Sequence, residues 1–176
     1  MLLQVKGETS VNKLILLFVF DKMECPLSER TILDMCTSSR EWINYMDCKV
    51  LIGKLLSDEF ICEIPGDDDP LYTITPEGRE TLANFYINIP RSTREEISQY
   101  VKKFGAKFRT KQECKADYYQ NKDGTYTVFL KILAAVQPML ELKFVVPDKK
   151  TANNIYKKWE DKASELYSVV YETLVD

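Results

Sequence analysis

Polar side chains of the kinds that hydrogen-bond to nucleic acids gather between residues 38 and 54. Asparagine can bond to adenine and lysine to guanine in the major groove of DNA. Serine hydroxyls can bond to phosphate oxygens. On an exposed helix and the turn before it, these side chains would face the same partner. We therefore predict DNA contacts from Ser38, Ser39, Arg40, Asn44, Tyr45, Lys49 and Lys54, with Val50 among them.

A helix from about Tyr45 to Ser57 is needed to position these residues. Its apolar residues recur at i, i+3, i+4 and i+7, which places them on one face, and they are Cys48, Leu51, Ile52 and Leu55. A second interpretation stays open, because Lys49 and Lys54 are also what the solvated face of any amphipathic helix carries.

Residue composition argues against catalysis. The chain contains no histidine, which removes the commonest general base and the Ser-His-Asp and Cys-His nucleophilic systems. Its five cysteines form no C-x-x-C pair, so buried, reduced thiols are favoured over a metal centre. No glycine-rich phosphate loop occurs. We predict no enzymatic activity, no catalytic residue, no metal site and no cofactor.

Charge is spread unevenly along the 176 residues. Residues 1–90 carry 8 Lys and Arg against 15 Asp and Glu, a net charge of −7. Residues 91–122 carry a net charge of +5, and residues 123–176 a net charge of −1. Because DNA affinity depends largely on neutralised phosphates, the acidic N-terminal part weakens the DNA hypothesis. It favours the alternative of a protein-interaction module.

Basic residues concentrate just after this acidic part. Such a run could flank DNA or pair with an acidic surface, but it is most often a solvated face. Its members are Arg91, Arg94, Lys102, Lys103, Lys107, Arg109, Lys111 and Lys115.

Two further features each allow two interpretations. The loop Pro65–Pro70 contains Asp67, Asp68 and Asp69, which could bind a divalent cation but more simply form a solvated turn. Phosphate repels them, so we predict that this loop enters no DNA groove. Aromatic residues could line a pocket for a small-molecule effector, or form core and dimer contacts: Phe85, Tyr86, Phe104, Phe108, Trp159, Tyr167 and Tyr171.

Periodicity predicts the remaining elements. Helices are expected over residues 11–22, 29–35, 76–88 and 94–104, and short strands over 60–64 and 71–74. On the first helix, Leu14, Ile15, Phe18 and Val19 form the predicted buried face. From residue 114 the period becomes two, Asp123-Gly124 predicts a hairpin turn, and an apolar stripe from Ala152 to Leu174 predicts a final helix.

The stretch Leu71–Leu82, LYTITPEGRETL, predicts a strand running directly into a helix. Thr75 can cap the helix, Pro76 suits its first position, and Glu77 suits the positive end of its dipole. Together with Leu55-Leu56 and Phe60-Ile61, this stretch resembles the end of a winged helix-turn-helix domain. Glu59 stands where that superfamily usually has glycine.

The whole chain resembles an uncharacterised bacterial family that joins a winged helix to a C-terminal β-β-β-α module. The resemblance rests on the stretch above, on Ile89-Pro90-x-x-x-Arg94, on Tyr118-Tyr119-x-x-x-Asp123-Gly124-x-Tyr126, and on Trp159. It implies an α+β fold: a winged helix-turn-helix over residues 1–90, a connecting helix over 91–111, and a three-stranded antiparallel meander packed on a long C-terminal helix over 112–176.

The same resemblance implies a transcriptional regulator that binds double-stranded DNA. We expect a homodimer, because DNA half-sites come in pairs. The apolar N- and C-terminal helices are expected to form the dimer contacts. The apolar run Leu14–Phe20 is too short to span a membrane, which takes about 20 apolar residues. We therefore expect a cytoplasmic chain without a membrane partner.

Overall fold

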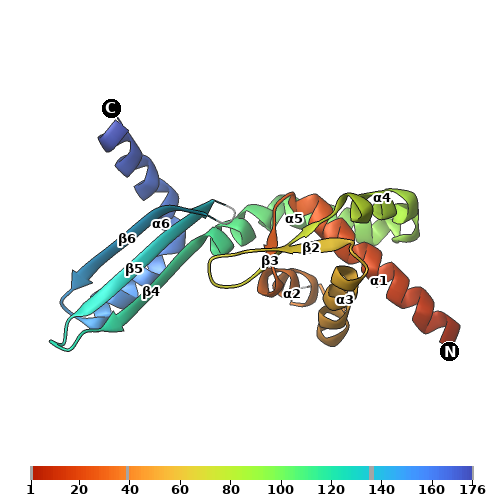
Figure 1. Cartoon of the computed structure of the whole chain (residues 1–176), viewed down its shortest axis with the longest axis horizontal. Helices are drawn as coiled ribbons and strands as arrows, with labels where there is room; N and C mark the ends of the chain where they lie inside the picture. The colour runs from red at the N-terminus through yellow and green to blue at the C-terminus, as the bar shows by residue number, and fades with distance from the viewer. Residues whose placement is uncertain (1, 39, 135–136, 176) are drawn as a thin grey trace. The chain divides into compact units, whose positions relative to one another are not determined.

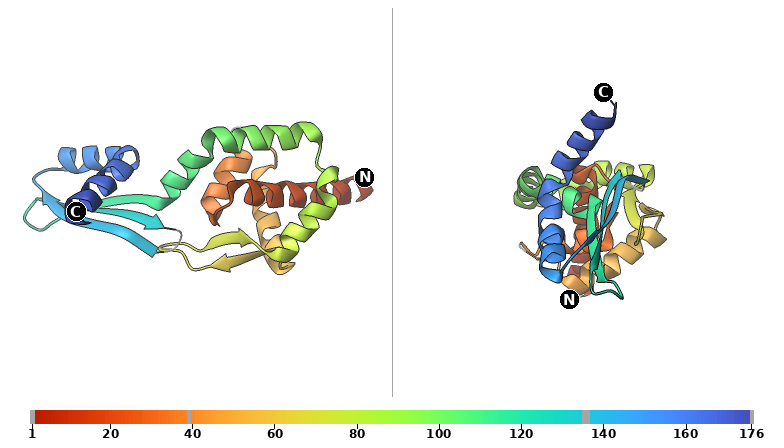
Figure 2. Two further views of the ribbon diagram at one scale, coloured as in Figure 1. Left: turned by 90° about the horizontal axis from the view of Figure 1, so that it is seen from above. Right: turned by 90° about the vertical axis from the view of Figure 1, so that its left-hand side faces the viewer.

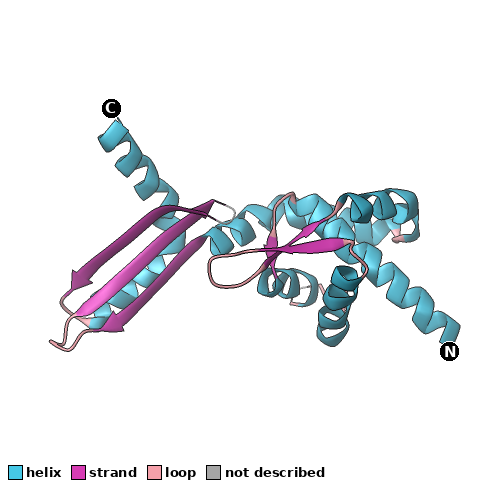
Figure 3. Cartoon of the chain, viewed as in Figure 1, coloured by secondary structure: helices cyan, strands magenta, loops and turns pink. Residues whose placement is uncertain are grey.

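The structure, a computed structural model, describes residues 2–38, 40–134 and 137–175. It contains two compact units, Met1–Phe108 and Arg109–Asp176. Helices and strands occur in both (Figure 3), so the α+β class expected from the sequence is confirmed.

The first unit is mainly helical (Figure 1). Its elements are, in order, α1 (Leu2–Met23), β1 (Leu27–Ser28), α2 (Glu29–Thr37), α3 (Tyr45–Ser57), β2 (Ile61–Ile64), β3 (Leu71–Ile74), α4 (Pro76–Phe85), the short 3-10 helix η1 (Tyr86–Asn88) and most of α5 (Arg91–Glu113). The helix-helix-strand-strand order from α2 to β3 is the order expected from the sequence.

Helix α1 runs through the middle of this unit (Figure 2). All seven residues from Leu14 to Phe20 are buried, so the single buried face predicted for this helix was too narrow. Helices α3 and α4, strand β3 and η1 all contact α1. A helix that is apolar on every side is one that is covered on every side. From α5, Ile97 joins the same core, and Tyr100 and Val101 pack against it.

The sheet of the first unit contains a strand that the sequence did not predict. Its order is β1-β3-β2, and Leu27 of β1 pairs with Tyr72 of β3. Two residues are too few to establish a period, so β1 has no signal in the sequence. Ser28 closes the strand and caps α2, because its Oγ accepts a hydrogen bond from Thr31 N at 3.2 Å.

The second unit is a sheet with one long helix. Its elements are β4 (Cys114–Gln120), β5 (Tyr126–Ala134), β6 (Gln137–Val146) and α6 (Lys149–Val175), and the strand order is β4-β5-β6. Both pairings are antiparallel, with Val128 opposite Tyr118 on one side and Phe144 on the other. The predicted three-stranded meander is confirmed. At its first turn Gly124 has φ +86°, as an Asp-Gly hairpin turn requires.

Helix α6 covers one face of this sheet (Figure 2). Trp159 is 4% exposed and packs with Val128 and Leu130 from the middle strand. Its indole Nε1 donates a hydrogen bond to the carbonyl oxygen of Lys131 at 3.1 Å. The indole therefore fills the core and also fixes the helix to one position along β5, since a buried N–H needs a partner.

Candidate nucleic-acid interface

Helix α3 presents one side to the core and the other to solvent. Cys48, Leu51, Ile52 and Leu55 are buried, as predicted. On the opposite side Met46 is 68% exposed and Val50 is 52% exposed. A Cβ built on Gly53 would touch nothing within 4 Å. This side is open enough to receive a large partner.

Its N-terminus is fixed by Asn44. The Asn44 Oδ1 atom accepts a hydrogen bond from Asp47 N at 2.9 Å, and the Asn44 Nδ2 group donates to the Asp47 carboxylate. Both ends of the amide are therefore engaged within the first turn of α3. Asn44 is a helix cap here, which is the commonest role of asparagine at this position, and would have to leave the cap to bond to a base.

The C-terminus of α3 closes in a Schellman motif. Phe60 N donates to Leu55 O at 2.9 Å, and Glu59 N donates to Leu56 O at 3.1 Å. Glu59 has φ +61°, the left-handed conformation that usually belongs to glycine at this position. Backbone geometry therefore favours glycine at this position, and this chain places a strained glutamate there.

The Thr75-x-x-Gly78-Arg79 pattern ties α4 to this turn. Thr75 Oγ1 donates to Glu59 O at 2.7 Å and accepts from Gly78 N at 3.0 Å. A Cβ on Gly78 would overlap the carbonyl oxygen of Phe60. Arg79 Nη1 bonds to Asp21 Oδ1 of α1 at 2.8 Å. The pattern thus positions α3, β3 and α4 together, and these contacts account for each of its three defining residues.

Two of the three cations predicted to contact DNA already have acidic partners. Arg40 Nη1 lies 2.8 Å from Glu96 Oε1, and Lys49 Nζ lies 3.0 Å from Glu29 Oε1. The hydrogen bond and the charge of Glu29 raise the pKa of Lys49. In the described part of the chain, Lys54 has no ion-pair partner, and its exposed side chain is available to a ligand.

The other predicted contact residues lie around the same helix. Tyr45 is 51% exposed at its first position. Ser38 is exposed and directly follows α2. Ser39 lies outside the described residues. Sequence analysis did not single out Met46, although its place four residues before Val50 was the available signal.

The loop between β2 and β3 is acidic and tight. Asp67, Asp68 and Asp69 are all exposed. A Cβ on Gly66 would overlap the carbonyl oxygen of Asp69, so the loop turns closely around the glycine. Among the described residues, no three His, Cys, Asp or Glu side chains are arranged to hold a metal ion.

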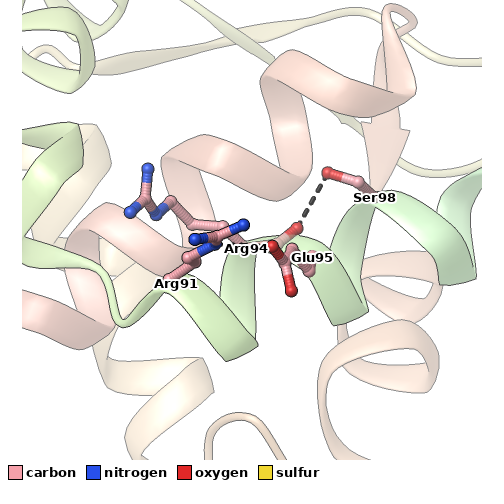
Figure 4. Close-up of polar contacts among 4 residues, drawn as sticks. All are labelled: Arg91, Arg94, Glu95 and Ser98. Carbon is pink, nitrogen blue, oxygen red and sulfur yellow. Dashed lines mark hydrogen bonds and ion pairs between the residues drawn. The ribbon is translucent and has the colours of Figure 1, made fainter.

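In the basic run that begins at Arg91, the two arginines at the start of α5 have contacts within the chain, and lysines further along the helix are exposed to solvent. At the start of α5, Arg91 Nε bonds to Glu95 Oε1 at 2.7 Å, and Ser98 Oγ donates to Arg94 O at 2.8 Å (Figure 4). The Arg94 guanidinium lies 4.2 Å from the centre of the Tyr86 ring, a cation–π contact. Further along α5, Lys102, Lys103 and Lys107 are exposed.

The aromatic residues considered for an effector pocket belong to separate clusters. Tyr100 lies 4.9 Å from Phe104 and 6.1 Å from Phe108 between ring centroids, within the first unit. Trp159 belongs to the core of the second unit. Trp42, which the sequence analysis did not include, meets Tyr100 edge-on at 5.3 Å. The 58 residues that separate this pair explain why periodicity could not detect it.

All five cysteines are free thiols. Cys36 of α2 and Cys48 of α3 are buried, as expected, and the hydrogen bond between them raises the pKa of Cys36 and lowers that of Cys48. The expectation of burial is wrong for Cys62, which is exposed on the short edge strand β2.

In the described residues, no helix combines the length and the apolar character needed to cross a bilayer. No curated protein and no solved structure matches this chain. A family model described as "Domain of unknown function (DUF4364)" matches residues 12–174. This match covers both compact units, and the chain therefore belongs to the DUF4364 family.

Proposed function

We propose that this protein is a DNA-binding transcriptional regulator whose first unit is a winged helix-turn-helix domain that binds DNA through α3. The observation that carries the proposal is the open side of α3. The helix is anchored at both ends by Asn44 and by the turn at Glu59, while Val50 and Gly53 face solvent. A rigid helix with one open side is what insertion into a major groove requires.

The proposed contacts follow from what each side chain has free. Lys54 can reach a phosphate or a guanine edge, and Val50 can contact a thymine methyl group. Lys49 would exchange Glu29 for a phosphate. The acidic loop at Asp67–Asp69 would stay away from the DNA backbone, because like charges repel. The regulator is proposed to act as a homodimer on paired half-sites, with no cofactor.

A second candidate function is protein binding by the same side of α3. It is favoured by the exposed Met46 and Tyr45, since methionine and tyrosine are enriched in protein interfaces and lysine is depleted. The ion pairs of Arg40 and Lys49 also favour protein binding over DNA binding. A cation that already has an acidic partner within the chain contributes less binding free energy to a phosphate contact.

Retention of fragmented genomic DNA by the purified protein, at low and at physiological salt, tests the proposal. Sequencing of the retained fragments should give a few palindromic sites that survive physiological salt. Lys54→Glu should abolish their enrichment, whereas Lys157→Glu, an equal charge change on exposed α6, should not. At Lys49, substitution by glutamine is preferred to a charge reversal, because a glutamate there would place a second carboxylate beside that of Glu29.

The opposite result favours the second candidate. If the protein retains nothing, or only fragments without sequence preference that dissociate at physiological salt, α3 does not bind DNA specifically. Co-purification from cell extract would then be compared for the wild type and Met46→Asp. A protein partner lost only from the variant would place its binding site on α3.

A further inference from the structure

We propose that a second copy of this chain binds the free edge of β6, so that two antiparallel three-stranded sheets join into one six-stranded sheet with its two-fold axis at Leu142. The strand order β4-β5-β6 leaves two edges, β4 and β6 (Figure 1). An exposed, long, apolar edge strand is a template for pairing with another chain. The inference concerns the second unit and stands whether or not α3 binds DNA.

The edge formed by β4 is less suited to pairing, because the side chain of Asp117 bonds to the backbone of the same strand. Asp117 Oδ1 accepts a hydrogen bond from the backbone N–H of Tyr118 at 2.7 Å. The carboxylate of Asp117 thus occupies one backbone donor of β4 and places a negative charge on this strand. Charged residues of this kind are how natural proteins prevent edge pairing.

The edge formed by β6 is irregular only near Met139, where its pairing with β5 shifts in register, and it pairs regularly with β5 from Leu140 to Val146. From Met139 to Val145, no side-chain hydrogen bond to the strand's own backbone is found in the described part of the chain. Three apolar side chains are well exposed along this segment: Val145 is 61% exposed, Met139 is 48% exposed and Phe144 is 40% exposed. Ten residues long, β6 is also the longest strand of the described sheets.

Charge complementarity fixes the register. In a two-fold antiparallel pair centred on residue n, residue n−1 of one copy lies opposite residue n+1 of the other. With Leu142 at the centre, Glu141 of each copy faces Lys143 of the other. Leu140 then faces Phe144, and both of these pairs lie in the part of β6 that pairs regularly with β5. Opposite residues also fall on the same face of the sheet, as cross-strand pairing requires.

Neighbouring registers are worse. If the axis passes through Glu141, the two Glu141 carboxylates face each other, and if it passes through Lys143, the two Lys143 ammonium groups do. Like charges opposite one another are destabilising. Centring the axis on Leu140 sets Glu141 against Met139, and centring it on Phe144 sets Lys143 against Val145. Within the chain, Glu141 already lies 3.3 Å from Lys131 Nζ. The second carboxylate oxygen of Glu141 can accept a hydrogen bond from the Lys143 ammonium group of the other copy.

Sedimentation equilibrium of the full chain tests the proposal through a charge swap. The wild type should be dimeric at micromolar concentration. Lys143→Glu and Glu141→Lys each place like charges opposite one another at two symmetric positions, and each should weaken dimerisation at least tenfold. The double variant Glu141→Lys with Lys143→Glu restores both pairs and should dimerise like the wild type. An equimolar mixture of the two single variants should form heterodimers.

A control and a second readout separate this edge from other interfaces. Lys157→Glu on α6 changes the charge equally and should leave dimerisation unchanged, and circular dichroism checks that each variant folds. Amide exchange in residues 139–145 should slow as wild-type concentration rises, with no such change in β4. A monomeric wild type, dimerisation insensitive to both single substitutions, or concentration-dependent protection confined to α1 or α6 would overturn the proposal.

Discussion

The two units of this chain are stabilised by different means. In the first, the segment Leu14–Phe20 of α1 is buried on every side, and hydrogen bonds around Glu59, Thr75 and Gly78 connect α3 to β3 and α4. In the second, one helix packs on one face of a sheet and is fixed by Trp159. We therefore expect the stability of the first unit to depend most on backbone geometry around the turn at Glu59. The stability of the second unit should depend most on the volume of the side chains that fill its core.

The largest effect that separates the two units should come from Trp159→Ala. Truncating a buried tryptophan costs about 3–5 kcal/mol, and this one also donates a hydrogen bond to Lys131 O. Hydrogen exchange should show lost protection in β4, β5, β6 and α6 while α1 stays protected. Tyr171→Ala is the matched control, because Tyr171 lies on the same helix but is 54% exposed, and it should cost less than about 1 kcal/mol. Equal loss in both units would refute the separation.

The corresponding change in the first unit is Gly78→Ala. A methyl group there overlaps the carbonyl oxygen of Phe60, so the turn after α3 has to move, at a cost of about 1–3 kcal/mol. Chemical denaturation followed by hydrogen exchange in α3 and α4 would measure it. Gly53→Ala, in open space in the same unit, should instead stabilise by about 0.5–1 kcal/mol. If both glycines respond alike, the contact with Phe60 does not position α4.

Local signals made the junction of β3 and α4 predictable. Thr75 at a cap, Pro76 after it and Glu77 in the first turn each favour a helix start through contacts within four residues. The turn at Gly124 was predictable for the same reason. Both were expected from the sequence and both occur.

Long-range pairing could not be predicted in this way. The partners Arg40 and Glu96 are 56 residues apart, so no local pattern could indicate that this predicted DNA-contacting cation already has an acidic partner. The burial of Leu14–Phe20 on every side of α1 had the same cause, since it depends on four elements that follow α1 in the chain. The open side of α3 was expected from periodicity, but the partners of its charges were not.

A smaller effect on stability is expected from the strained residue Glu59 in the first unit. Glu59→Gly removes the strain of a side chain at φ +61°, where an L-residue other than glycine costs about 1–2 kcal/mol, offset partly by the greater freedom of glycine in the unfolded chain. We expect a gain of about 0.5–1 kcal/mol in the free energy of unfolding. The same substitution at Glu80, in the interior of α4, should cost about 1 kcal/mol. Destabilisation at both positions would show that the Glu59 side chain has a stabilising contact that outweighs the strain.

The smallest effect concerns how each unit caps a helix. Thr75 caps α4 with a neutral hydroxyl, whereas Asp148 accepts the backbone N–H of Thr151 at the start of α6 at 2.9 Å and its hydroxyl at 3.0 Å. These bonds to Thr151 hold the pKa of Asp148 below its ordinary value. A carboxylate whose pKa is lower in the folded than in the unfolded chain contributes stability above the unfolded value of about 3.9. That contribution is lost as the pH falls through the lower folded value.

Acid titration of the wild type and of Asp148→Asn therefore distinguishes the two caps. Between pH 6 and pH 3, the difference in stability between the two proteins should shrink, and exchange at the start of α6 should reveal it. At the start of α4, the wild type and Thr75→Ser should show no pH-dependent difference in exchange, because both have a hydroxyl cap without charge. Thr75→Ser keeps the hydroxyl and serves as the control. A pH-independent difference at Asp148 would mean that the charge of its carboxylate contributes nothing and that the amide caps α6 equally well.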